Sequence, residues 1–202
     1  MRRSAPAPKL TFRPATPDRW DDIETLFGPR GAMAGCWCMW WRLARSEFQK
    51  NAGAGNRRAF KKIVDGGAIP GILAYDGDRP VGWCAIQPKA AYPSLARSRT
   101  KTVDDRPCWS VACFFIAKDH RGHGVSEALL AAAVDHARKN GARLVEGYPI
   151  DTDKRAMDFS SFMGRPGSSP RPASPRPRAP ARTDRSCAGN CGADPGNYLA
   201  LA

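Results

Sequence analysis

The feature that most constrains this chain is a strand that leads through two closely spaced glycines into a helix. The almost wholly apolar segment 109–116 predicts a buried strand. A short charged turn follows, then Gly122 and Gly124, and from Val125 an amphipathic pattern predicts a helix that ends at Gly141. Backbone N–H groups at such a glycine turn and helix start point together, and they can bind a phosphate group.

The glycine turn fits two familiar phosphate-binding patterns poorly. A P-loop requires Gly-Lys-Ser/Thr after its second glycine, where this chain has Val125 and Ser126. A dinucleotide-binding fingerprint requires a third glycine or alanine, where Glu127 stands. Taken alone, the turn could also be a tight structural turn that needs two small residues. The turn by itself therefore leaves both roles open.

The predicted helix has one face that is expected to pack on a sheet. The positions that follow the i, i+3, i+4, i+7 spacing are Val125, Ala128, Leu129, Ala132 and His136. Before this helix and after it, the chain predicts enough strands for a mixed sheet and hence a three-layer α/β fold. The other expected elements are a strand at 10–13, a helix with Thr16 as N-cap and Pro17 as first residue through about 27, a basic helix at 56–64, a hairpin with strands at 71–75 and 80–86, a short helix and loop at 89–105, and a strand at 143–150.

Charge and cysteine content bear on partners and compartment. The net charge of +13 suits an anionic ligand such as a nucleotide cofactor, and it would also suit nucleic acid. No segment approaches the roughly 20 apolar residues that span a bilayer, and no apolar stretch follows the basic N-terminus, so we expect no membrane partner and no secretory signal. Seven cysteines are an odd number and predict no disulfide framework, which favours a cytoplasmic location.

The glycine turn in its context resembles the acetyl-CoA loop of the GNAT superfamily of N-acetyltransferases. Arg121, Gly124 and Ser126 follow an apolar strand and precede the helical segment 128–130, as in the family's pattern Gln/Arg-x-x-Gly-x-Gly/Ala. Ser126 departs from that pattern, although serine is small enough to let the backbone approach a ligand. The elements over residues 10–163 also occur in the family's order. We therefore expect one domain there, with the three-layer α-β-α GNAT-like fold and a mixed central sheet.

By this resemblance, acetyl-CoA would be the co-substrate. The residues implied to bind it are Phe114, Phe115, Ile116, Arg121, Gly122, His123, Gly124, Val125 and Ser126. The end of the strand would pair its backbone with the pantetheine arm, and a backbone N–H there would polarise the thioester carbonyl. The N–H groups from the glycine turn into the helix would bind the pyrophosphate.

Acetyl transfer also requires a base for the amine and a proton for the leaving thiolate. We predict Glu146 as the base, because it lies on the strand after the helix, next to where that strand would part from the cofactor strand. Tyr148 shares its face and is the predicted acid. A surface carboxylate and a packed aromatic ring are the structural alternatives. The family often supplies the acid from a tyrosine on the following helix, but segment 159–162 contains none.

An aromatic run after the first helix is predicted to contact the acceptor. The resemblance places this loop over the acceptor site, where Trp37, Trp40 and Trp41 would form a wall that holds an amine. The alternative is that these rings cap the core. Cys36 and Cys38 lie in the same run, but no Cys-x-x-Cys or nearby histidine completes four ligands, so we predict no metal site.

The two ends of the chain predict disorder. Residues 1–9 read as a leader, and residues 164–202 hold seven of the 18 prolines without apolar periodicity. A GNAT-like domain would continue with a helix and two strands, so the last strands of the sheet are expected to be missing. Codons can be chosen for residues 172–191 so that the frame starting at the third base of the Pro172 codon reads GFTEAARPGANRPVMRGEL, which begins like the end of many GNAT domains. We interpret the tail as the product of a frameshift that weakens catalysis, which the coding DNA can test.

These inferences imply an N-acetyltransferase that moves an acetyl group from acetyl-CoA to a primary amine of a small molecule or peptide. One alternative is a GNAT-like domain that binds acetyl-CoA without catalysis. A second alternative is a basic nucleic-acid-binding module. The basic residues at 57–62 and 97–101 are scattered along the chain and lie on no recognised reading helix, which counts against this second alternative.

Overall fold

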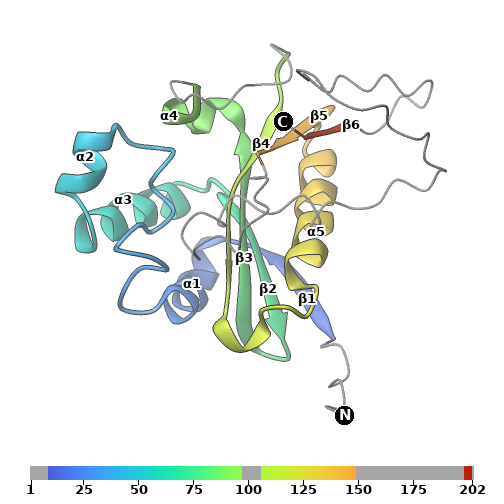
Figure 1. Cartoon of the computed structure of the whole chain (residues 1–202), viewed down its shortest axis with the longest axis horizontal. Helices are drawn as coiled ribbons and strands as arrows, with labels where there is room; N and C mark the ends of the chain where they lie inside the picture. The colour runs from blue at the N-terminus through green and yellow to red at the C-terminus, as the bar shows by residue number, and fades with distance from the viewer. Residues whose placement is uncertain (1–8, 97–105, 149–197, 202) are drawn as a thin grey trace, which may run out of the picture.

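The computed structural model describes residues 9–96, 106–148 and 198–201. Figure 1 shows the described elements arranged around one central sheet. Most of the predicted leader, the segment 159–162 and the tail from 164 to 197 lie outside the described residues. The predicted frameshift therefore falls where the structure describes nothing.

The sheet has six strands in the order β1-β2-β3-β4-β5-β6. Neighbouring strands from β1 to β4 run antiparallel, whereas β4, β5 and β6 run parallel to one another. The sheet is thus mixed, as the sequence predicted. The strands are β1 Leu10–Pro14, β2 Gly71–Asp76, β3 Arg79–Pro88, β4 Trp109–Ile116, β5 Leu144–Gly147 and β6 Tyr198–Leu201.

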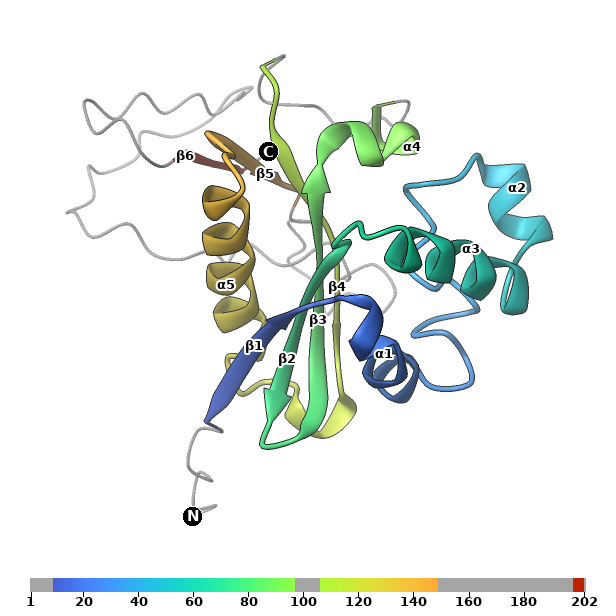
Figure 2. The same cartoon turned by 180° about the vertical axis from the view of Figure 1, so that it is seen from behind.

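Helices cover both faces of the sheet and complete the predicted three layers. The longer helix α5 packs on one face, and α1 and α3 pack on the other (Figures 1 and 2). The α-helices are α1 Trp20–Phe27, α2 Arg45–Lys50, α3 Ala54–Asp65, α4 Pro93–Ala96 and α5 Val125–Lys139. Short 3-10 turns lie at η1 Pro17–Arg19, η2 Lys89–Ala91 and η3 Lys118–His120.

Helix α5 packs on the sheet through a face that is rotated from the predicted one. Its buried residues are Val125, Leu129, Leu130, Ala133 and Ala137. The predicted His136 is only half-buried and packs its ring against Trp109. The helix is rich in alanine, so its sequence fits two overlapping faces, and the fit to the sheet selects one. Gly82 of β3 permits the close approach, since a Cβ there would lie 2.7 Å from Leu129 Cδ1.

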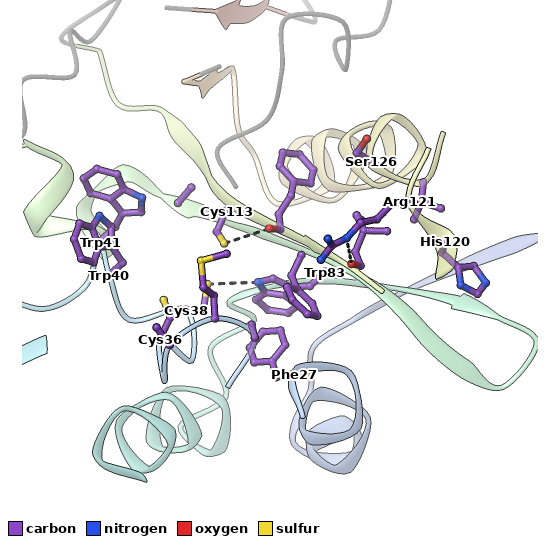
Figure 3. A pocket seen from close by; sticks show the side chains of 18 of the residues that line it. Phe27, Cys36, Cys38, Trp40, Trp41, Trp83, Cys113, His120, Arg121 and Ser126 are labelled. Atoms are coloured by element: carbon purple, nitrogen blue, oxygen red, sulfur yellow. Dashed lines mark hydrogen bonds between the residues drawn. The ribbon is translucent and has the colours of Figure 1, made fainter. Parts of the chain in front are cut away.

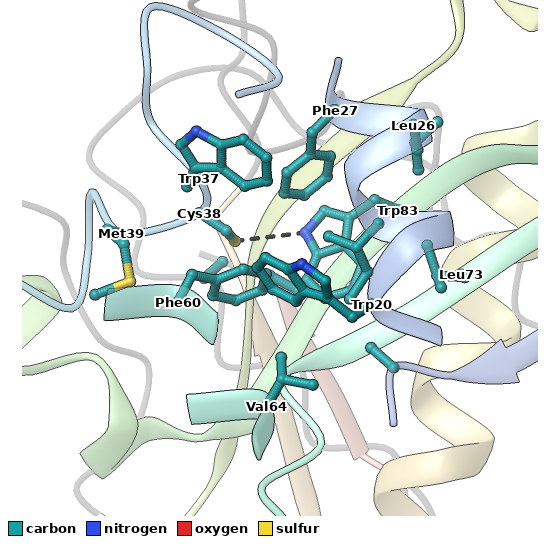
Figure 4. Packing of buried hydrophobic residues seen from close by; sticks show 14 of the residues in the cluster. Trp20, Leu26, Phe27, Trp37, Cys38, Met39, Phe60, Val64, Leu73 and Trp83 are labelled. Carbon is teal, nitrogen blue, oxygen red and sulfur yellow. Dashed lines mark hydrogen bonds between the residues drawn. The ribbon is translucent and has the colours of Figure 1, made fainter. Parts of the chain in front are cut away.

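The opposite face carries an aromatic core under α1 and α3 (Figure 4). Trp83 of β3 is fully buried, with Phe27 and Phe60 at ring-centroid distances of 5.7 Å and 5.9 Å in edge-on geometry. Trp20 stacks on Trp37 at 6.1 Å. The burial of such large aromatic side chains is the main stabilising contribution of this layer.

The boundaries of several elements differ from those predicted. Pro17 begins the 3-10 turn η1, with Thr16 as its N-cap, and the α-helix proper starts only at Trp20. The sequence did not predict α2, which is six residues long and buries none of them. The hairpin turn is tighter than predicted, because β2 continues to Asp76 and β3 begins at Arg79.

The tail was predicted to be disordered, but four of its residues form strand β6. Tyr198–Leu201 pair in parallel with Leu144–Gly147 of β5 at the edge of the sheet. The rest of the predicted tail up to residue 197 lies outside the described residues. An uncovered strand edge presents unpaired N–H and C=O groups, so an apolar segment of the same chain can add to it.

Candidate functional site

The second half of β4 lies beside an opening in the sheet. Strand β5 pairs only with Trp109–Val111, whereas β3 pairs with β4 as far as Ile116. The register between β3 and β4 also shifts, because Ile86 pairs with Val111 while the preceding residue pairs with Cys113. Ala112 is therefore the extra residue of a β-bulge, and such bulges often lie next to active sites. Within the described residues, no strand covers the outer edge of β4 beyond this bulge.

The glycine turn connects the end of β4 to the start of α5. Gly122 and Gly124 have φ angles of +80° and +76°, in the left-handed region that favours glycine. Gly124 is the N-cap of α5, and a Cβ at either glycine would meet no atom within 4 Å. The first N–H groups of a helix have no partner inside it. The turn thus presents these donors to open space, with the positive end of the helix dipole behind them.

A cavity of about 660 Å³ joins the glycine turn to the bulge of β4 and extends beyond it. Its lining includes all but one of the nine residues predicted to bind acetyl-CoA; the exception is His123, which is exposed. Figure 3 shows Arg121 and Ser126 at one end of the cavity and Trp40 and Trp41 at the other. The Nε of Arg121 donates to the Ile116 carbonyl oxygen at 3.1 Å and so ties the turn to β4.

The aromatic end of the cavity contains two of the three predicted tryptophans. Trp40 and Trp41 line it together with Phe48 and Tyr92. Trp40 meets Trp41 and Phe48 edge-on, at 6.2 Å and 5.1 Å. Trp37 is buried in the core and does not line the cavity. Two of the three predicted tryptophans therefore line the cavity. Trp37 instead packs in the core, which was the alternative interpretation.

Glu146 and Tyr148 meet each other in a buried polar cluster next to the bulge. The Tyr148 hydroxyl donates to Glu146 Oε2 at 2.6 Å, and the Lys89 Nζ lies 3.2 Å from the same oxygen. Ser110 Oγ lies 3.2 Å from the Tyr148 hydroxyl. Burial, first of all, and the bond to Glu146 raise the pKa of Tyr148. The structure brings the two predicted residues together, but neither lines the cavity.

This geometry can be compared with known proteins. The family model for the acetyltransferase (GNAT) family matches residues 37–164, which is well over half of the chain. The chain belongs to the acetyltransferase (GNAT) family. A comparison with curated protein sequences finds no match.

Solved structures that are similar to this GNAT-family chain include three acetyltransferases. Aminoglycoside N-acetyltransferase AAC(6')-Iy in complex with CoA is 14% identical, with a TM-score of 0.45, over 70% of this chain and 78% of that chain. Mosquito arylalkylamine N-acetyltransferase like 5b is 14% identical, with a TM-score of 0.46, over 67% and 74%. The aminoglycoside acetyltransferase meta-AAC0020 from an uncultured soil metagenomic sample, in complex with sisomicin, is 12% identical, with a TM-score of 0.46, over 87% and 97%. The family assignment rests on the sequence match alone.

Several cavity residues were not predicted from the sequence. Cys38, Cys113 and Tyr92 line the middle of the cavity and its aromatic end, although they come from distant segments. The almost wholly apolar sequence of β4 does not show which of its side chains leave the core or which loop they meet. Among the described residues, no group of three or more His, Cys, Asp or Glu side chains is placed to hold a metal ion. None of the described helices has the length and apolar character needed to cross a bilayer.

His120 joins the turn before the glycines to the β2–β3 hairpin. Its Nδ1 lies 3.1 Å from Asp119 Oδ1, and its Nε2 lies 3.1 Å from Asp76 Oδ2. Arg79 pairs with Asp119 at 2.7 Å. The hydrogen bonds to Asp119 and then Asp76 raise the pKa of His120. When the ring is protonated, it therefore helps to hold η3 against the hairpin.

This pKa shift predicts a pH dependence of stability that His120→Gln should remove. A raised folded-state pKa stabilises the fold fully below the ordinary pKa of about 6.5, and the contribution is lost as pH rises through the raised pKa. We expect His120→Gln to lower the free energy of unfolding more at about pH 5.5 than at about pH 8.5, in urea titrations.

His136 is the matched control with the opposite sign. Burial is the main cause that lowers its pKa. Its contribution is therefore present above about pH 6.5 and is lost as pH falls through the lowered pKa. His136→Gln should therefore not show the larger loss of unfolding free energy at the lower pH that is expected of His120→Gln. Equal losses for His120→Gln at both pH values would show that the histidine acts only through packing.

Proposed function

We propose that this chain transfers an acetyl group from acetyl-CoA to a primary amine. The observation that carries the proposal is one continuous cavity that joins the glycine turn, the edge of β4 that no described strand covers, and an aromatic end. The GNAT family match supports the same reaction class. An anionic diphosphate, an amide-bearing arm and an apolar amine would each meet a suitable surface along this cavity.

The glycine turn fits the pyrophosphate of acetyl-CoA. The open space at Gly122 and Gly124 lets a phosphate approach the backbone, and the start of α5 supplies N–H donors and a favourable dipole. The edge of β4 beyond Val111, which no strand of the described residues covers, offers backbone groups that the pantetheine amides can pair with in the manner of an added strand. Phe114 and Ile116 line this part of the cavity.

The bulge at Ala112 is where we place the thioester. A bulge residue is left out of the ladder, so its backbone N–H can donate to the developing oxyanion of the thioester. The amine nitrogen attacks the carbonyl carbon, a C–N bond forms, and the C–S bond breaks to release the CoA thiolate. The amine also loses a proton.

Glu146 and Tyr148 remain our proposals for general base and acid. Glu146 pairs with Ser110 of β4, two residues before the bulge residue Ala112, and it is buried and outside the cavity lining. A proton would therefore travel to it through an intervening group. The raised pKa of Tyr148 keeps its hydroxyl protonated and able to donate.

We propose an acceptor amine with an apolar or aromatic body. The far end of the cavity presents Trp40, Trp41, Phe48 and Tyr92. Among the lining residues in the described part of the chain, Glu127 is the single carboxylate, and it lies at the start of α5, beside the glycine turn. A polycationic acceptor would find few anionic partners at the aromatic end, whereas an aromatic ring would pack there.

The test is calorimetric binding of acetyl-CoA followed by a turnover assay that measures free CoA thiol with a panel of amines. We expect binding of acetyl-CoA and faster turnover with 2-phenylethylamine than with polyamines. Binding without turnover on any amine would favour the non-catalytic alternative. Absence of acetyl-CoA binding would contradict the proposal, and salt-dependent binding of duplex DNA instead would favour the nucleic-acid module.

A further inference from the structure

A buried arginine contacts the aromatic end of the cavity from outside. Arg42 is only 9% exposed, and its guanidinium lies over the Tyr92 ring, with Cζ 4.6 Å from the ring centroid. Tyr92 lines the cavity, and so does Trp41, which directly precedes Arg42 (Figure 3). Arg42 itself does not line the cavity. Tyr92 thus connects the charge of Arg42 to the cavity.

The charge of Arg42 is not balanced within the part of the chain that the structure describes. Its Nη1 donates to the Ala91 carbonyl oxygen at 3.5 Å and its Nη2 to the Tyr92 hydroxyl at 3.4 Å, which are both long contacts. Its Nε has no hydrogen-bond partner, and no carboxylate of the described residues lies at ion-pair distance. A buried cation without an anion is unfavourable. An anion that enters the cavity would supply the missing charge.

The Tyr92 hydroxyl offers a donor for such an anion. The residue is 1% exposed, and its hydroxyl oxygen accepts from Arg42. A hydroxyl can also donate its own proton, and among the described residues no acceptor takes it. Burial is the largest cause that raises the pKa of Tyr92, so the hydroxyl stays protonated. A carboxylate oxygen is the acceptor that gains most from this donor, because its charge strengthens the hydrogen bond.

Backbone contacts hold the arginine and the tyrosine together. The Ser94 N–H donates to the Trp41 carbonyl oxygen at 3.0 Å, and the Tyr92 N–H donates to the Lys89 carbonyl oxygen at 2.9 Å. The loop that carries Arg42 is therefore joined to the segment 89–96 that carries Tyr92. The charge and the hydroxyl are thus in place before a ligand binds, which lowers the entropic cost of binding.

The charges around the aromatic end disfavour a cationic group there. The guanidinium of Arg42 already occupies one face of the Tyr92 ring, and the Cζ of the exposed Arg45 lies 5.1 Å from the centroid of the Trp40 ring. An ammonium group on these rings would lie near like charge. Within the described residues, the one lining carboxylate, Glu127, lies at the start of α5, beside the glycine turn. The aromatic end therefore suits an apolar body with an anionic group.

We propose that the acceptor amine carries a carboxylate in addition to its apolar body, and that Tyr92 and Arg42 bind this carboxylate. The proposal rests on the proposed function and names its substrate class, the amino acids with an apolar or aromatic body. The Tyr92 hydroxyl donates to a carboxylate oxygen, and Arg42 supplies the compensating charge through its own bond to the hydroxyl oxygen. The amine of the same molecule attacks the thioester directly, as described above.

The first test compares two inhibitors of the same shape and different charge. 3-Phenylpropanoate and 3-phenylpropanamide carry no amine, so they report binding without the chemistry. Each is measured as an inhibitor of 2-phenylethylamine turnover at saturating acetyl-CoA. We expect the carboxylate to bind about 10-fold or more tightly than the amide, which is the effect of one hydrogen bond to a charged group. Equal inhibition by both would overturn the inference, while turnover of 2-phenylethylamine would leave the proposed function standing.

Arg42→Met removes the charge and keeps a side chain of similar length. Replacing a buried charge by an apolar residue is commonly tolerated, so the variant is expected to fold. The preference for the carboxylate should fall to about 2-fold or less, and Arg42→Lys should retain part of it. Tyr92→Phe keeps the ring and should also lower the preference. If Arg42→Met weakens both inhibitors equally, Arg42 acts only through packing and the inference is wrong.

Arg45→Met is the matched control. Arg45 also lies over a ring that lines the cavity, but it is exposed, so solvent screens its charge. The preference for the carboxylate should be unchanged in this variant. A fall as large as that in Arg42→Met would show that the general positive charge of the region decides the preference, and it would overturn the assignment to Arg42.

The second test measures kcat/KM for two pairs of acceptors: phenylalanine with phenylalaninamide, and 4-(aminomethyl)benzoate with 4-(aminomethyl)benzamide. We expect the carboxylate of at least one pair to exceed its amide by about 10-fold. The amide group of phenylalaninamide makes its amine less basic and leaves more of it free, so amine reactivity would favour the opposite order. A preference for the amide in both pairs would overturn the inference. Absence of turnover with every amine, 2-phenylethylamine included, would instead remove the proposed function, and this inference with it.

Discussion

Gly124→Glu is expected to lower the affinity for acetyl-CoA by about 100-fold or more, because a carboxylate would stand where we propose that the pyrophosphate binds, and like charges about 4 Å apart repel by several kcal/mol. The site has room for the side chain, since a Cβ at Gly124 would meet no atom within 4 Å. The φ of +76° adds a cost of about 1 kcal/mol to the folded state. The measurement is isothermal calorimetry with acetyl-CoA.

Gly141→Glu is the matched control for this variant. Gly141 follows the other end of the same helix, has a φ of +84°, and also has open space around its Cβ position. It therefore receives the same charge and a similar backbone penalty, but far from the glycine turn. We expect acetyl-CoA affinity to be unchanged. Equal affinity of Gly124→Glu and wild type would contradict the assignment of the pyrophosphate site.

Trp83→Ala is expected to lower the free energy of unfolding by about 3–5 kcal/mol, a large part of the roughly 5–15 kcal/mol of a typical domain. The ring is 0% exposed and lies at the centre of the aromatic core, in contact with Phe27 and Phe60. Its loss also removes the donor to Cys38. The measurement is equilibrium unfolding in urea, with Trp83→Phe as a milder variant if the alanine protein does not fold.

Trp109→Ala is the corresponding control. Trp109 lies on the neighbouring strand β4, but it is half-buried and packs its ring edge-on against His136 at 6.0 Å. Less apolar area is buried there, so the expected loss is about 1 kcal/mol. A similar loss for both variants would show that the layer under α1 and α3 does not hold the principal core.

The glycine turn and its neighbours were predictable because the information is local. An apolar run, two glycines and an amphipathic repeat fall within one continuous segment, and each residue's preference follows from its own backbone and the spacing. The family's loop pattern lies within the same segment. The strand Trp109–Ile116 and the start of α5 at Val125 are confirmed at the predicted residues. The hairpin was predictable for the same reason.

Elements whose limits depend on distant contacts were predicted less well. The rotation of α5 about its axis depends on Gly82 of β3, which lets the helix approach the sheet closely. Trp83 of the same strand packs on the opposite face of the sheet. The short α2 has no buried face and hence no apolar pattern to reveal it. Trp37 and Trp40 look equivalent in the sequence, yet one is in the core and the other lines the cavity.

The sequence by itself determined the strand, the glycine turn and the helix start, and with them the end of the cavity that suits a diphosphate. Only the tertiary structure decided what surrounds the proposed thioester position. Cys38, Trp83 and Cys113 come together from a loop and two strands, and the buried Arg42 lies near Cys38. The physical reason is that local preferences depend on neighbours along the chain, whereas a hydrogen bond or a Coulomb interaction between distant residues exists only once the core has packed and brought them together.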